Sequence, residues 1–158
     1  MNCSDRLTYR EITLEDAPLI VKWRSDPSVY KYFTRPHKIT VDEHVNWFNN
    51  SYKNDSNRID FMALDRDGKP VGIFGIRRDD SDPFEAEVSY IIDPEFYGRG
   101  YGSEGVKWLM SQCSEIWNCR AVTAEIHKDN ISSVNLVKKL GFTEQKTNGN
   151  FVIYGREL

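Results

Sequence analysis

Long apolar runs are missing from this 158-residue sequence. No stretch approaches the roughly 18 apolar residues of a membrane-spanning helix, and residues 1–10 carry charge without an apolar run, so we expect neither a membrane span nor a signal peptide. Cysteines are also scarce. The three present, Cys3, Cys113 and Cys119, form an odd set without a CxxC pair. This usage predicts reduced thiols in a cytoplasmic protein.

Metal-ligand spacing and an excess of positive charge are absent as well. His37, His44 and His127 do not follow a metal-ligand spacing, so no metal is expected. The 21 basic and 24 acidic residues give a formal net charge of −3. That balance argues against nucleic acid or an anionic membrane as a general partner. Neither is therefore expected as a partner, and paired edge strands would allow a homodimer.

The composition does support a packed core. Hydrophobic residues make up 39% of the chain and aromatic residues 13%, which excludes a disordered protein. We find no internal repeat, low-complexity segment or linker, so residues 1–158 are expected to form one domain.

Apolar periodicity and turn residues predict the order of elements. Strands are expected at 7–12, 58–65, 70–78, 85–92, 121–127, 142–146 and 151–156. Helices are expected from the capping box at Thr13 to Asp26–Pro27, over 41–52 after a second capping box, through 106–117, and over 130–140. This order predicts an α+β fold: a mixed, mostly antiparallel sheet with helices packed on it.

Glycine is concentrated at one place. Four of the ten glycines, Gly98, Gly100, Gly102 and Gly105, fall within eight residues. From Gly100 the letters spell GxGxxG, the dinucleotide-binding fingerprint. We reject that interpretation because the preceding strands are joined by short turns and are antiparallel, the tight strand-to-helix turn is absent, and too few residues follow. A P-loop is excluded because GxxxxGK[ST] is absent.

Two interpretations of the cluster remain. A flexible loop with a helix cap accounts for one or two glycines but poorly for four. The alternative is an anion cradle, in which consecutive backbone N–H groups and the positive end of the helix from Ser103 bind a pyrophosphate, helped by the Arg99 side chain. In the cradle, a side chain at Gly102 would occupy the place of the phosphate.

The sequence here resembles the GNAT superfamily of acetyl-CoA-dependent N-acetyltransferases. Residues Tyr97–Gly102 follow the family pattern [QR]xxGx[GA] and depart from it only at the first position. Glu87–Pro94 resembles the family's fourth strand. Asn130 with Ser133, followed by Leu140–Phe142, resembles its closing helix and strand. The resemblance extends over nearly the whole chain and implies the GNAT fold.

The resemblance implies that acetyl-CoA is the co-substrate. The residues implied to bind it are Tyr90, Ile91, Ile92, Gly98, Arg99, Gly100, Tyr101, Gly102, Ser103 and Asn130. Backbone amides from Arg99 to Ser103 would hold the pyrophosphate, and the strand at 90–92 would pair with the pantetheine arm. The Ile92 N–H would face the thioester oxygen, and Asn130 would bind the pantetheine arm.

The resemblance also implies catalytic roles. Glu87 matches the family's strand glutamate, which would accept the proton of the attacking amine; the alternative is an ordinary solvent-facing glutamate. Glu125 is a weaker candidate. The position of the usual proton-donating tyrosine is occupied by Val137. The remaining proton donors are Ser133, Tyr90, Tyr101 or solvent. Transfer would occur directly in a ternary complex, without an acyl-enzyme.

The acceptor is expected on the amino-terminal third. Segments 20–32 and 40–48 resemble amino-sugar N-acetyltransferases of the pseudaminic-acid type, which act on nucleotide-linked amino sugars, and less closely ribosomal-protein N-terminal and polyamine acetyltransferases. Trp23 and Arg24 are the expected substrate contacts, although a tryptophan at that spacing also suits a helix core. The non-enzymatic alternative is an acyl-CoA-binding regulatory module.

Overall fold

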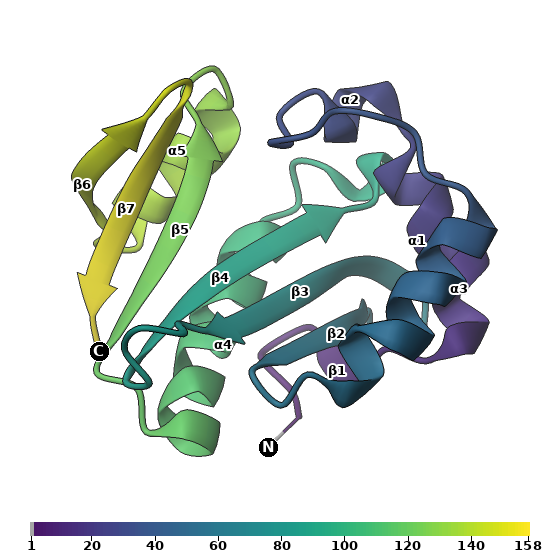
Figure 1. Cartoon of the computed structure of the whole chain (residues 1–158), viewed down its shortest axis with the longest axis horizontal. Coiled ribbons are helices and arrows are strands. Elements are labelled where there is room, and N and C mark those ends of the chain that lie inside the picture. The colour runs from purple at the N-terminus through teal and green to yellow at the C-terminus, as the bar shows by residue number, and fades with distance from the viewer. Residues whose placement is uncertain (1) are drawn as a thin grey trace.

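A seven-stranded mixed sheet forms the centre of the protein (Figure 1), of which a computed structural model describes residues 2–158. The strands are β1 (Thr8–Glu11), β2 (Arg58–Leu64), β3 (Pro70–Arg78), β4 (Glu85–Ile92), β5 (Ala121–His127), β6 (Thr143–Asn148) and β7 (Phe151–Glu157). Their order is β1-β2-β3-β4-β5-β7-β6. Only β4 and β5 are parallel neighbours. The expected mixed, mostly antiparallel α+β fold is confirmed.

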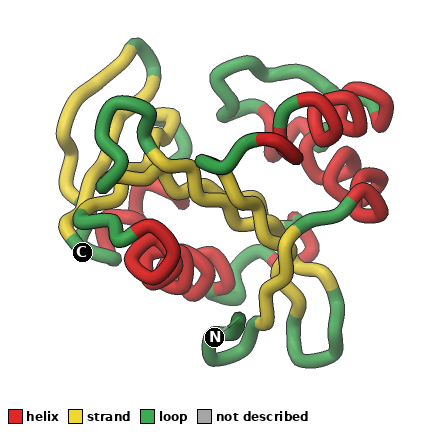
Figure 2. Tube along the Cα trace, turned by 60° about the horizontal axis from the view of Figure 1, so that its bottom comes forward, coloured by secondary structure: helices red, strands yellow, loops and turns green. Residues whose placement is uncertain are grey.

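Helices lie on both sides of the strands (Figure 2). They are α1 (Ala17–Arg24), α2 (Pro27–Tyr30), α3 (Val41–Asn50), α4 (Tyr101–Trp117) and α5 (Ile131–Lys139), with 3-10 turns η1 (Leu14–Asp16), η2 (Tyr52–Asn54) and η3 (Pro94–Phe96). Within residues 2–158, none of these helices has the length and apolar character needed to cross a bilayer.

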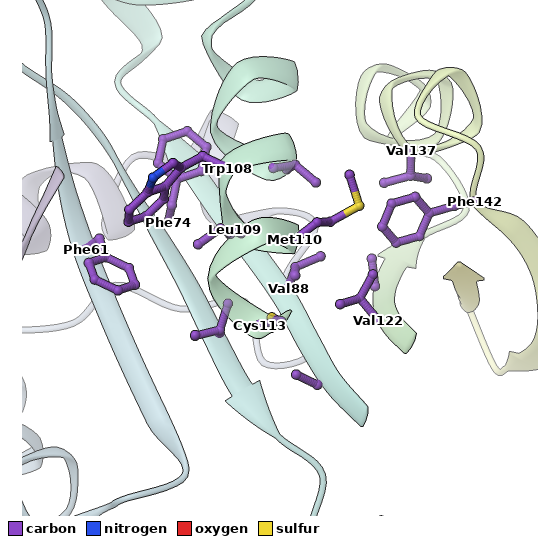
Figure 3. Packing of buried hydrophobic residues seen from close by; sticks show 14 of the residues in the cluster. Phe61, Phe74, Val88, Trp108, Leu109, Met110, Cys113, Val122, Val137 and Phe142 are labelled. Carbon is purple, nitrogen blue, oxygen red and sulfur yellow. The ribbon is translucent and has the colours of Figure 1, made fainter. Parts of the chain in front are cut away.

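The sheet carries a different hydrophobic cluster on each face. On one face α4 packs through Leu109 and Cys113 against strand residues such as Phe74, Val88 and Val122 (Figure 3). On the other face a smaller cluster joins α1 to β2 and β3; its buried members are Ile12, Ile20, Trp23, Met62 and Ile73. This division follows from strand alternation, because successive side chains point to opposite faces.

Helix starts and stops largely follow the capping residues. Thr40 caps α3, accepting from the Glu43 N–H at 3.1 Å. Pro27 departs from expectation: instead of only ending α1, it starts the short helix α2, where Asp26 accepts from the Ser28 N–H at 2.9 Å. Proline suits a first helical position because its missing N–H would have no partner there.

The sheet splits between β4 and β5. These two strands pair only from Glu85 to Glu87, opposite Ala121 to Thr123, and beyond that point they diverge (Figure 1). On the opposite side of β4, pairing with β3 continues from Ala86 to Ile92. One edge of β4 is therefore left open over its second half.

Gly105 fits α4 tightly onto the sheet, and we predict that Gly105→Ala destabilises the protein. A Cβ at this position would overlap the Phe74 ring. Overpacking of this kind costs about 1–3 kcal/mol, whereas helix propensity alone would make alanine more stable by about 1 kcal/mol. Urea unfolding distinguishes the two by the sign of the change, and a gain in stability would contradict the packing role.

Candidate active site

The amino-terminal end of α4 presents a row of free backbone donors. Gly98 and Gly100 have φ values of 77° and 78°, a left-handed conformation that glycine adopts without strain. Among residues 2–158, no described group accepts a hydrogen bond from the backbone N–H groups of Arg99 to Ser103. The first N–H groups of a helix have no partner within it and carry the positive end of its dipole. These groups make the loop suited to an anion.

The four clustered glycines serve two purposes. Gly98 and Gly100 supply the left-handed turns, whereas Gly102 and Gly105 allow close packing. A Cβ at Gly102 would lie 2.9 Å from Leu136 Cδ1 and 3.3 Å from the Tyr90 ring. The expectation that a side chain at Gly102 would enter the phosphate's place is therefore corrected. Its Cβ points into the contact between α4, β4 and α5.

The open edge of β4 carries the next set of free donors. The Asp93 N–H donates to the Val71 carbonyl on β3 at 2.9 Å. Hydrogen-bonding direction alternates along a strand, so the N–H and C=O groups of Tyr90 and Ile92 point to the other side, toward the split. An extended ligand can bind this edge as an added strand.

The split also holds a pair of hydroxyl groups. Tyr90 Oη and Ser133 Oγ are 2.8 Å apart, which joins β4 to α5. Burial raises the pKa of Tyr90, against the opposing effect of its hydrogen bond with Ser133, so the phenol is protonated at neutral pH. Val137 is 1% exposed and belongs to the core. Tyr90 and Ser133 therefore place two hydroxyl groups, both able to donate a proton, in this part of the split.

Asn130 caps α5. Its Oδ1 accepts from the Ser133 N–H at 3.4 Å. The described residues offer no acceptor to its side-chain nitrogen, which leaves that donor for a ligand in the split.

Glu87 lies on the opposite face of β4 from Tyr90. It stands in register with Arg77 on β3 and Thr123 on β5. Water reaches its side chain, but the surrounding protein removes part of its hydration. This loss, together with the nearby charge of Glu125, raises the pKa of Glu87. A carboxylate with a raised pKa is a better proton acceptor.

Next to Glu87 on the same face is a group of charges. Asp60 on β2 forms an ion pair with Arg58 at 3.0 Å. Asp60, Gly75 and Ser89 lie in register across β2, β3 and β4, and a Cβ at Gly75 would lie 2.5 Å from Asp60 Oδ1 and 3.3 Å from Ser89 Oγ. Glycine at this position therefore makes room for the Asp60 carboxylate beside Ser89.

Arg24 completes this group without a carboxylate partner. None of the ion pairs within residues 2–158 includes it, and its guanidinium carbon lies 5.6 Å from the centre of the Phe33 ring. Burial and the charge of Arg58 lower the pKa of Arg24, and Asp60 opposes the shift. A partly buried cation that forms no ion pair is costly and is suited to a ligand anion.

Trp23 is placed differently from the expectation. Its ring is 1% exposed, in the core between α1 and the sheet, so it offers no face to a substrate. Helical spacing puts Trp23 on the same buried face as Ile20, which explains the correction.

Sequence reasoning did not single out Arg58 and Asp60; a charged pair two residues apart in a buried strand was the available signal. It also gave no role to the contact between the rings of Tyr32 and His127 on β5, whose ring centroids are 5.5 Å apart.

The described residues contain no group of three or more histidine, cysteine or acidic side chains placed to hold a metal ion.

Residues 6–143 match the family model described as an acetyltransferase (GNAT) domain. The chain belongs to the GNAT acetyltransferase family. One GNAT relative, the uncharacterized N-acetyltransferase p20 of Bacillus licheniformis, is 27% identical over 146 residues, which cover 90% of this chain and 82% of that protein. The family assignment makes the chain an acetyl-CoA-dependent N-acetyltransferase.

Solved structures share this GNAT fold. A domain from Methanocaldococcus jannaschii superposes with a TM-score of 0.85 at 26% identity, covering 99% of this chain and all of that one. Spermidine N-acetyltransferase from Vibrio cholerae, solved in complex with CoA and spermine, gives a TM-score of 0.87 at 19% identity, covering 96% and 95%. At that identity the second likeness concerns the fold alone.

We predict that Gly98→Ala weakens CoA binding at least tenfold. The left-handed φ disfavours alanine by about 1–2 kcal/mol, so the loop relaxes and its N–H groups turn away from a common point. Gly68→Ala is a matched control, because Gly68 has a φ of 78° and, like Gly98, has no atom within 4 Å of an added Cβ. Both variants should lose similar stability, and only Gly98→Ala should lose affinity by calorimetric titration. Equal CoA affinities of the Gly98→Ala and Gly68→Ala variants would exclude the cradle.

Proposed function

We propose that this protein transfers the acetyl group of acetyl-CoA directly to the primary amine of a small molecule that also carries an anionic group, such as a nucleotide-linked amino sugar. The observation that carries the anionic part of the proposal is the partly buried Arg24, which forms no ion pair within residues 2–158. Family membership supports acetyl transfer, and the two rows of free backbone donors support the donor side.

The donor fits an extended path. The N–H groups from Arg99 to Ser103 suit the pyrophosphate, and the free edge of β4 at Tyr90 and Ile92 suits the pantetheine arm. Asn130 offers a side-chain donor on the other wall of the split. Acetyl-CoA, when bound, supplies the thioester from which the acetyl group is transferred. The backbone N–H and C=O groups of Ile91 face Ile73 on β3, so Ile91 offers no backbone donor to this path.

The proposed chemistry needs a proton acceptor and a proton donor. Glu87 takes a proton from the acceptor ammonium, directly or through water, so that the nitrogen lone pair can attack the acetyl carbon. The Ile92 N–H donates to the thioester oxygen as negative charge develops there. The new C–N bond forms as the C–S bond breaks, the nitrogen loses its second proton to water, and the Tyr90–Ser133 pair returns a proton to the sulfur.

The acceptor side favours an anionic substrate over a polyamine. A polyamine site needs carboxylates that are not already neutralised, whereas Asp60 is paired with Arg58 and Arg24 adds a positive charge that forms no ion pair. A phosphate or carboxylate that binds Arg24 would satisfy this charge with charge-assisted hydrogen bonds. Glu87 lies on the same face of β4 as Ser89, two positions along the strand, and would accept the proton of the amine of the same molecule.

Thiol release from acetyl-CoA with a panel of amines tests the acceptor class. We expect turnover with amino-sugar nucleotides and little with spermidine or peptide amino termini. We further predict that Arg24→Ala raises the KM for the anionic acceptor about 10- to 100-fold, the equivalent of one charge-assisted hydrogen bond of 1.5–3 kcal/mol, with an unchanged KM for acetyl-CoA.

Other outcomes of the panel identify the alternatives. Selective turnover of spermidine, or of ribosomal-protein amino termini, would replace the acceptor class and retain acetyl transfer. Tight CoA binding with no turnover of any amine would indicate an acyl-CoA-binding regulatory module. An Arg24→Ala variant with an unchanged acceptor KM would remove the anionic group from the proposal.

The raised pKa of Glu87 gives a pH signature. Glu87 must be deprotonated to act, so kcat should fall as the pH is lowered through its raised pKa. Glu87→Gln should reduce kcat about 100-fold and abolish this acidic limb while leaving CoA affinity unchanged. Glu125→Gln is the control: it removes a repulsive charge, so it should move the limb to lower pH and retain the maximal rate. A pH profile that is the same in Glu87→Gln and the wild type would assign Glu87 a structural role.

A further inference from the structure

The amino-terminal segment Asn2–Leu7 folds against the start of α4, 98 residues further along the chain. Four donors from this segment converge on the carboxylate of Glu104, which lies in the first turn of α4: Ser4 Oγ, the backbone N–H groups of Arg6 and Leu7, and Arg6 Nε. The Glu104 side chain is 12% exposed. Burial alone would raise its pKa, but these hydrogen bonds hold the pKa of Glu104 below its usual value.

Arg6 connects this carboxylate to the cradle loop. Its Nε lies 2.8 Å from Glu104 Oε1, and its Nη1 donates to the backbone carbonyl of Arg99 at 2.8 Å. The guanidinium also stacks over the Tyr101 ring, 4.7 Å from its centre. On its other side, Arg6 Nη2 lies 3.3 Å from where a Cβ of Gly100 would be. One side chain therefore contacts Arg99 and Tyr101 and lies beside Gly100 between them.

The bond to the Arg99 carbonyl fixes the direction of a cradle donor. In a trans peptide unit the C=O and N–H groups point in opposite directions. With the Arg99 carbonyl held toward Arg6, the N–H of Gly100 must point away from Arg6. Gly100 has no side chain to stabilise this left-handed turn, so the bond from Arg6 supplies the restraint that the glycine itself lacks.

Arg6 also balances a charge. Glu104 places a negative charge one helical turn from donors that suit a pyrophosphate, where it would repel that ligand. The Arg6 guanidinium compensates the charge at hydrogen-bond distance.

We propose that Arg6 is a positioning residue for donor binding: with Glu104 as its anchor, it holds the Arg99–Gly100 peptide in the orientation that binds the pyrophosphate of acetyl-CoA. This inference rests on the proposed binding of that pyrophosphate to the cradle. Arg6 contacts the loop on the side away from the Gly100 N–H.

An acetyl donor that lacks the pyrophosphate makes the test specific for the cradle. We expect Arg6→Ala to raise the KM for acetyl-CoA at least tenfold with a similar kcat at saturation, and to leave kcat/KM for S-acetylpantetheine, which has no pyrophosphate, within twofold of wild type. Arg6→Lys should have an intermediate effect, because an ammonium keeps the charge but lacks the planar fork that reaches two acceptors.

Arg10→Ala is the matched control. Arg10 lies on β1 and forms a similar, partly buried ion pair with Asp16 through two contacts of 2.8 Å. It does not touch the cradle. It should lower thermal stability about as much as Arg6→Ala and leave the KM for acetyl-CoA unchanged. Equal increases in both variants would mean that Arg6 acts only through general stability and would overturn the inference.

Glu104→Gln distinguishes two possible roles of Glu104, the anchoring of Arg6 and the repulsion of the pyrophosphate. The first predicts weaker acetyl-CoA binding and the second predicts tighter binding. Removing a negative charge near a pyrophosphate should tighten acetyl-CoA binding if Glu104 acts only through its charge. Loss of the anchor should instead weaken binding severalfold, which is the expected result; tighter binding would overturn the anchoring role.

If Gly98→Ala weakens CoA binding and Arg6→Ala does not, the inference about Arg6 is wrong and the cradle stands. If neither has an effect, the cradle itself is wrong.

Discussion

The end of pairing between β4 and β5 is the constraint on which the rest of the site depends. After Glu87 and Thr123 the two strands separate, and β4 keeps its ladder with β3 alone. Backbone groups that would be satisfied in a continuous sheet are left facing the gap. Unpaired backbone groups are costly when buried, so a protein retains such an edge where a ligand completes it. The helix that follows β4 then begins near the open end of the gap.

The two faces of the sheet carry different kinds of polar group at this point. The face covered by α4 and α5 offers backbone donors and hydroxyl groups, which suit a ligand with a diphosphate. The face beneath α1 offers Glu87, the Arg58–Asp60 pair and Arg24. Each set of groups suits only one of the two ligands. The two sets meet at the split between β4 and β5, because a molecule bound on one face can reach the other face there.

The strands were the most predictable part of the structure. Apolar residues bounded by turn residues gave the bounds 70–78, 85–92 and 121–127, which agree with β3, β4 and β5. Strand β5 alternates in burial along its length, and β4 does so over residues 85–89, whereas β3 is buried on both faces and reads as an apolar run. Helix α4 was expected from Ser103, two residues after its observed start at Tyr101. Helix α2 was not, since proline both ends one helix and begins the next.

Side-chain roles that depend on distant partners could not be read from the sequence. Tyr90 and Ser133 are 43 residues apart and Arg6 and Glu104 are 98 apart, so no local pattern pairs them. Trp23 shows a different limit: its neighbour Arg24 suggested an exposed aromatic, but a helix turns by about 100° per residue, so adjacent positions can have opposite environments. Only the fold decides which of the two faces the core.

The opposite orientation of Glu87 and Tyr90 on one strand has a consequence for how the enzyme resets. With the proposed roles, each turnover leaves an extra proton on Glu87 and a missing one at the Tyr90–Ser133 pair, separated by the thickness of the sheet. No side chain on β4 joins the two, because neighbouring residues alternate between the faces. Each group therefore recovers its starting protonation state by exchange with bulk water on its own side, after the corresponding product has left.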